Sequence, residues 1–208
     1  MMRRWVALTA LAAVWTAVPS AMAAPVPPLI AAARLSGSFV MSGTVTRAVG
    51  VPGERAGQTV LRTWSFVPLC EAGGCAAVQL ARARPGGTDQ VLLQRQGPGF
   101  YTGVGSFLAP SRCHGIVYRR GALVPFTISV RVTAAAPVGA LVQATQVRAT
   151  YRNRKRINLT KCFAAPSYDS ASYLGAPLAA GAIRTVARTR SSTASRRRRS
   201  GPLPAITT

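Results

Sequence analysis

Apolar and polar side chains alternate along much of this chain with a period of two residues. The segment Pro125–Thr133 is the clearest example, and one of its faces carries Phe126, Ile128, Val130 and Val132. Such alternation is typical of a β-strand with one face in a core. The same pattern occurs in 36–48, the two halves of 59–84, 89–96, 100–107, 115–120 and 141–156. The sequence therefore predicts about eight strands.

Turn-forming residues separate these segments, as in Gly50–Gly53 and Gly97–Gly99. No segment of normal length shows the period of an amphipathic helix. Short connections between successive strands favour an antiparallel meander. We therefore predict an all-β fold, in which the strands close into a barrel in preference to forming a two-sheet sandwich, the alternative architecture.

The two ends of the chain differ from its middle. Arg3 and Arg4, a following apolar stretch and the small residues around Ala23 predict that Met1–Ala23 is a signal peptide. The protein is then secreted, with no transmembrane anchor. The remaining predicted parts are an extended linker over 24–35, a β domain over 36–175 and a disordered basic tail over 176–208.

Four cysteines in an exported chain are expected to form disulfides. We predict the pairs Cys70–Cys75 and Cys113–Cys162. The first closes a short loop and should contribute about 2 kcal/mol to stability, whereas the second closes a long loop and should contribute about 4 kcal/mol. A zinc site is the less favoured alternative, because the cysteine spacing is unsuitable and His114 is the only histidine.

The chain is strongly basic, with 26 Lys and Arg against 4 Asp and Glu, and a net charge of +22. All four acids lie within 36–175, and that segment nevertheless stays cationic. Such a protein attracts polyanions. Coding bias is an alternative explanation for the excess of Arg over Lys, but it does not explain the shortage of acids.

Several arginines lie within the last alternating segment, 141–156. If this segment stays extended to residue 156, its polar face carries Arg148, Arg152, Arg154 and Arg156, and Arg131 lies on the preceding strand. The guanidinium group suits carboxylate and phosphate partners. We predict that these five arginines bind an anionic cell-envelope polymer or lipid surface, without specific nucleic acid binding; a solvated face without function is the alternative.

The sequence contains no catalytic motif. His114 lacks the partners of a hydrolytic triad, and nothing marks two of the four acids as a catalytic pair. We predict that the protein is not an enzyme and uses no cofactor or metal. A barrel could also carry a small apolar ligand, but the aromatic residues are numerous enough to fill its interior. An extracellular hydrolase is the least favoured alternative.

Several short motifs carry a resemblance to known proteins. They are RTWSF (Arg62–Phe66), CEAGGC (Cys70–Cys75), GFYTG (Gly99–Gly103), ATYRN (Ala149–Asn153) and DSASYLG (Asp169–Gly175). Together with the signal peptide they resemble small, uncharacterised exported proteins of high-GC Gram-positive (actinobacterial) bacteria. The resemblance implies an extracellular domain over residues 36–175 and assigns no catalytic residue.

Overall fold

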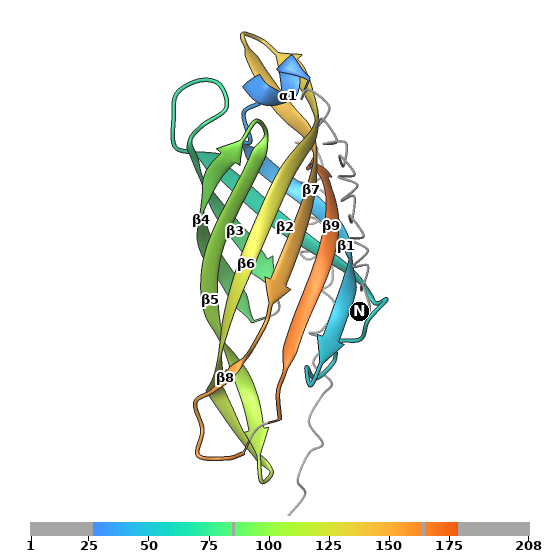
Figure 1. The fold of residues 1–208 in the computed structure, drawn as a ribbon, viewed down its shortest axis with the longest axis vertical. Helices are drawn as coiled ribbons and strands as arrows, with labels where there is room; N and C mark the ends of the chain where they lie inside the picture. The colour runs from blue at the N-terminus through green and yellow to red at the C-terminus, as the bar shows by residue number, and fades with distance from the viewer. Residues whose placement is uncertain (1–26, 85, 164, 179–208) are drawn as a thin grey trace, which may run out of the picture.

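A computed structural model describes residues 27–84, 86–163 and 165–178 (Figure 1). The predicted signal peptide and nearly all of the predicted tail lie outside these residues. Within them, the elements are α1 (Pro28–Ala32), β1 (Gly37–Val49), β2 (Thr59–Pro68), β3 (Ala77–Arg84), β4 (Gly87–Gly97), β5 (Phe100–Cys113), β6 (Ile116–Val138), β7 (Leu141–Asn153), β8 (Ile157–Asn158) and β9 (Tyr168–Pro177).

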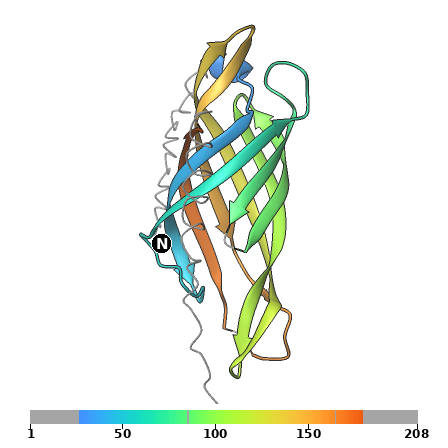
Figure 2. The same ribbon diagram turned by 180° about the vertical axis from the view of Figure 1, so that it is seen from behind.

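Eight of these strands form a closed antiparallel barrel, as predicted. Hydrogen bonds connect β5, β4, β3, β2, β1, β9, β7 and β6 in that order, and pairing between β5 and β6 closes the ring. The strands from β1 to β7 follow one another as a meander, and β9 fills the space between β7 and β1 (Figures 1 and 2). The ninth strand, β8, pairs only with β6.

The inward-facing side chains fill the middle of the barrel. Trp64, Phe39, Phe66 and Tyr101 are at most 2% exposed, and the rings of Phe39 and Phe66 meet edge to face at 5.4 Å. Fully burying a side chain of this size contributes about 1.5–3 kcal/mol. The alternation in the sequence predicted this core because residues two apart share one face of a strand.

Several details differ from the prediction, and two of them concern the strands β6 and β9. The segments 115–120 and 125–133 form one strand, β6, which continues through Pro125. The carbonyl of Pro125 accepts a hydrogen bond from the Asn153 side chain, whereas β7 pairs with β6 only from Thr127 onward. The missing N–H of proline therefore interrupts no ladder bond.

The second difference is β9, which lies beyond the last predicted strand and extends to Pro177. Its inward positions include the small residues Ala171 and Gly175, so its hydrophobic alternation is weak. A Cβ atom at Gly175 would overlap the Met41 side chain. Gly175 is thus required by close packing against Met41 of β1.

One end of the barrel is closed by apolar residues of the N-terminal segment. The predicted extended linker contains the short helix α1, and Ala33 and Leu35 after it are at most 1% exposed. Arg34 forms a parallel bridge with Gln143 of β7. No helix among the described residues is both long and apolar enough to cross a membrane.

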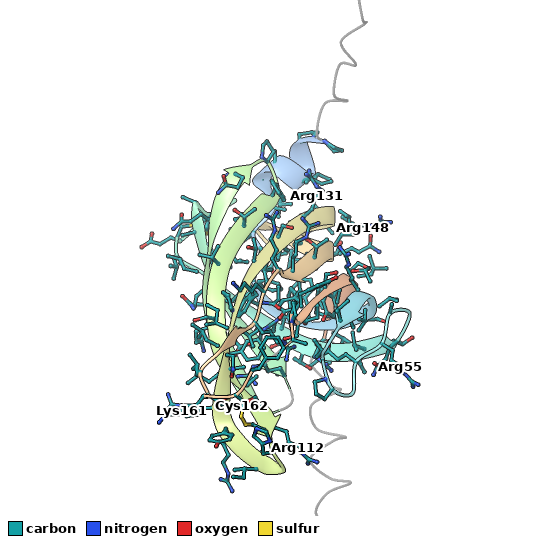
Figure 3. The ribbon with its side chains drawn as sticks, turned by 60° about the horizontal axis from the view of Figure 1, so that its bottom comes forward. Arg55, Arg112, Arg131, Arg148, Lys161 and Cys162 are labelled. Carbon is teal, nitrogen blue, oxygen red and sulfur yellow. A yellow bond between two sulfur atoms is a disulfide. The ribbon has the colours of Figure 1, made fainter. Side chains whose placement is uncertain are left out.

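Both predicted disulfides are present. Cys70–Cys75 closes the loop between β2 and β3. Cys113–Cys162 joins the end of β5 to the segment after β8, at the end of the molecule opposite α1 (Figure 3).

Candidate functional site

The acids and the bases of this protein occupy different places. Asp89 and Asp169 are buried inside the barrel, Glu54 is half-buried at its open end, and Glu71 is the one exposed acid of the four. The exposed basic residues in the described part of the chain are Arg47, Arg55, Arg112, Arg119, Arg120, Arg131, Arg148, Arg152, Arg154, Lys155 and Lys161. The exposed charges of the described residues are consequently almost all positive.

Two of the predicted anion-binding residues lie directly opposite each other. Arg131 on β6 and Arg148 on β7 are register partners with exposed side chains (Figure 3). The guanidinium of Arg131 lies 4.5 Å from the centre of the Phe100 ring, a favourable cation–π contact. Like charges opposite each other are unfavourable unless solvent or an anion separates them.

A second group of arginines surrounds a groove on the outer face. Arg152 and Arg154, both predicted, line this groove of about 640 Å³ together with Arg47 of β1. Ser170 of β9 is the register partner of Arg47 on one side and of Arg152 on the other. We call Arg47, Arg152 and Arg154 the arginine groove. None of its three side chains forms an ion pair with the described residues.

Arg156 does not belong to this face, and the predicted strand ends earlier than expected. β7 stops at Asn153, whose buried amide donates to the carbonyls of Pro125 and Lys155. These bonds redirect the chain, so strand periodicity no longer applies. The Arg156 Nη2 atom instead donates to Asp169 Oδ1 at 3.0 Å, inside the open end of the barrel.

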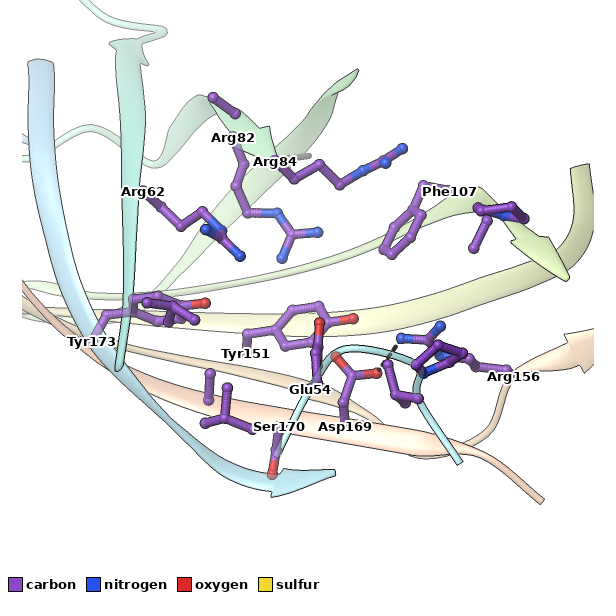
Figure 4. Close-up of a pocket in the computed structure, with 18 residues that line it drawn as sticks. Glu54, Arg62, Arg82, Arg84, Phe107, Tyr151, Arg156, Asp169, Ser170 and Tyr173 are labelled. Atoms are coloured by element: carbon purple, nitrogen blue, oxygen red, sulfur yellow. Dashed lines mark hydrogen bonds and ion pairs between the residues drawn. The ribbon is translucent and has the colours of Figure 1, made fainter. Parts of the chain in front are cut away.

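This open end, opposite α1, contains a pocket of about 290 Å³. We call it the mouth pocket (Figure 4). Its charged lining residues are Glu54, Arg62, Arg82, Arg84, Arg156 and Asp169. Its aromatic lining residues are Phe107, Tyr151 and Tyr173.

A buried ion pair forms one wall of the mouth pocket. Arg82 and Asp89 are register partners on β3 and β4, and their Nη2 and Oδ2 atoms lie 2.6 Å apart. Arg84 Nε contacts the other oxygen of the same carboxylate at 2.8 Å. The Arg82 guanidinium also lies 4.4 Å from the centre of the Phe126 ring and 4.6 Å from that of Tyr151. These contacts replace the water that a buried charge loses.

Burial also changes the titration of the pocket residues. Desolvation, and secondarily the neighbouring Asp169 carboxylate, raise the pKa of Glu54. Desolvation likewise raises the pKa of both Tyr151 and Tyr173. The two phenol groups therefore stay protonated at neutral pH and can donate hydrogen bonds.

The mouth pocket was not predicted from the sequence, although the strand pattern contains a signal for it. Arg62 lies two residues before Trp64, Arg82 two residues after Leu80, and Asp89 two residues before Val91. Each charge therefore continues the inward face of its strand toward the same end of the barrel. Charges at inward positions of several strand ends predict a polar cluster at a barrel opening.

His114 lies at the tip of the β5–β6 hairpin. Its ring nitrogens and the sulfurs of Cys113 and Cys162 come within 4.8 Å of one another. The two sulfurs are joined in a disulfide, so neither can act as a thiolate ligand for a metal.

Comparison with known proteins provides no relative. No protein-family model, characterised protein or solved structure matches this chain.

Proposed function

We propose that this protein is a secreted, non-enzymatic binding module that holds an anionic polymer of the cell envelope through its outer arginines. The observation that carries this proposal is the separation of charge described above. Three of the four acids are turned away from the outer surface, whereas the arginine groove and the pair Arg131–Arg148 have no acidic partner among the described residues. The two disulfides support export, because such bonds persist in oxidising compartments.

The spacing of the arginines favours an extended ligand. Arg148 and Arg152 are four residues apart on β7, which corresponds to about 13 Å along a strand. The intervening outward residue, Thr150, is paired with Ser129 of β6. A ligand that contacts both arginines therefore needs negative groups at more than one position, as a polymer has.

Nucleic acid is a less suitable ligand for this surface. Single-strand binding proteins combine basic residues with several exposed aromatic rings on which bases stack. In the arginine groove, Tyr168 is the one aromatic lining residue, and its ring already lies 4.9 Å from the Arg47 guanidinium. A charged polymer without bases matches the groove better.

Retention on immobilised heparin, a general polyanion, tests the proposal. The protein should remain bound at about 150 mM salt. Replacing Arg47, Arg152 and Arg154 together by Glu should release the protein from heparin. The salt dependence of any remaining binding should correspond to about three fewer released counterions. Vesicles with anionic lipid form a comparison arm, and tighter binding to them than to heparin would contradict a polymer ligand.

A matched control separates a specific face from general charge. Replacing Arg112, Arg119 and Arg120 by Glu changes the net charge equally, on exposed residues of the β5–β6 hairpin. This variant should lose much less affinity for heparin. Equal losses in the two variants would show that the arginine groove has no special role.

A further inference from the structure

The mouth pocket contains more positive than negative charge. Four arginines lie there against three acids, if Asp89 behind the pocket is included. Asp89 is shared by Arg82 and Arg84, and Asp169 is paired with Arg156. Arg62 has no ion pair among the described residues, and its one hydrogen bond goes to the carbonyl of Leu61.

Two other arginines present unused donors. The Nε atoms of Arg82 and Arg156 are buried without a hydrogen-bond partner. The Arg82 side chain is only 7% exposed, so its unpartnered donor is deep within the protein. A buried polar group without a partner is unfavourable, and an acceptor that entered the pocket could relieve this cost.

We propose that the mouth pocket binds a small organic acid, with its carboxylate or phosphate group near Arg62 and Arg156 and its apolar body against Phe107 and Tyr151. This site is separate from the arginine groove. Its ligand is a compact molecule, whereas the proposed ligand of the outer surface is a polymer. The guanidinium groups enter the pocket from β2 and β3 on one side and from the segment after β7 on the other (Figure 4).

The lining fits an anion better than a cation. Two of the three carboxylates already have arginine partners, and the four arginines outnumber the three acids. The neutral hydroxyl of Tyr173 adds a donor for an anionic head group, whereas the Tyr151 hydroxyl already bonds to Asp169. Arginine recognises both carboxylate and phosphate with paired hydrogen bonds.

The size of the pocket restricts the ligand to a small molecule. About 290 Å³ lies at the lower end of the range for ligand pockets. The barrel behind it is closed by side chains such as Trp64, which is fully buried and whose ring centre lies 5.2 Å from that of Tyr173. A long lipid chain could not extend into the interior, whereas a single ring with one acidic group could fit.

Isothermal titration calorimetry on the full chain tests this site with four related probes. Benzoate and phenyl phosphate carry the two possible anionic groups, benzylamine carries a positive charge, and benzyl alcohol is neutral. We expect one or both of the anions to bind more tightly than the other two probes. The preferred anion identifies the head group. Absence of binding by both anions, or equal binding of benzylamine, would overturn the proposal.

Variants locate the binding. Arg62→Gln should weaken the preferred anion about tenfold or more, because a charged hydrogen bond to the ligand is lost. Arg148→Gln removes the same charge from the outer face and should leave this affinity unchanged. Retention on heparin should show little change in Arg62→Gln, so the two sites are tested independently.

A second variant protects the test against misfolding of the first. Tyr173→Phe removes only a hydroxyl group and should weaken anion binding several-fold while thermal unfolding still shows a folded protein. Unchanged affinity in both Arg62→Gln and Tyr173→Phe would place the anion elsewhere and refute the mouth pocket as its site.

Discussion

The arginines in the mouth pocket and those on the outer face have the same side chain in opposite environments. Inside, Arg82 is 6% exposed and contacts a carboxylate and two aromatic rings. Outside, Arg131 and Arg148 face each other without an acid. A charge removed from water needs a partner, whereas water and salt screen an exposed charge.

This difference explains where the few acids lie. Asp89 and Asp169 are placed beside buried guanidinium groups, and hardly any acid remains to neutralise the surface. The net charge of the chain alone therefore does not distinguish arginines that stabilise the fold from arginines available to a ligand. The positions of the acids distinguish the two groups of arginines.

The largest effect should follow from breaking the buried ion pair. Asp89→Ala leaves Arg82 charged in the barrel and should reduce the free energy of unfolding by about 3–5 kcal/mol. Urea unfolding with the disulfides intact measures this loss. Arg148→Ala, on the outer face, should change stability by less than about 0.5 kcal/mol.

If the two substitutions had similar effects on stability, the contrast between inner and outer arginines would be wrong.

A double variant sharpens the comparison. Arg82→Met combined with Asp89→Leu removes both charges and should recover part of the stability lost in Asp89→Ala, since an apolar pair can replace a buried ion pair.

A smaller loss is expected at the edge of the mouth pocket. Asp169→Asn keeps the size of the side chain but removes the charge that pairs with Arg156, whose side chain is 13% exposed. The expected decrease in the free energy of unfolding is about 1–3 kcal/mol. A larger loss of stability than in Asp89→Ala would contradict the expectation that the more buried pair, Arg82–Asp89, contributes more than Arg156–Asp169.

The smallest effect concerns Glu54 and depends on pH. Because its pKa is raised above the ordinary value of 4.5, the folded state binds this proton more readily than the unfolded state. Stability from this group is present below pH 4.5 and decreases as the pH rises through the raised pKa. Glu54→Gln should therefore be slightly more stable than the wild type at pH 7.

Thermal unfolding of Glu54→Gln and the wild type across a pH series measures this difference. The advantage of the variant should disappear below pH 4.5, where the wild-type carboxyl group is also neutral. A stabilisation that persisted unchanged at pH 3 to 4 would have a cause other than ionisation.

The alternation of side chains was sufficient to predict most of the barrel. Strong patterns, as in Pro125–Thr133, appear in the structure as strands with the expected face inside. β9 was not predicted because its inward residues Ala171 and Gly175 carry little hydrophobic signal, and Gly175 must be small because Met41 packs against it. The contact that requires Gly175 comes from β1, which is distant in sequence.

The candidate sites were only partly accessible to the same reasoning. Arg131 and Arg148 could be paired by assuming a hairpin, and they are partners. Arg47 could not be assigned to the arginine groove from sequence, because it reaches that groove through pairing of β1 with β9. Arg156 was misplaced because side-chain hydrogen bonds of Asn153, and not strand periodicity, set the path of the chain there.

The sequence by itself determined that this chain forms antiparallel strands with a filled interior, two disulfides and a large excess of positive charge. These properties depend on residues close in the chain or on composition. Only the tertiary structure decided which charges are neutralised, because pairing of β9 with β7 places Asp169 beside Arg156 and leaves Arg156 outside the arginine groove. Alternation assigns each residue to a face, but pairing between distant strands decides which charges meet there.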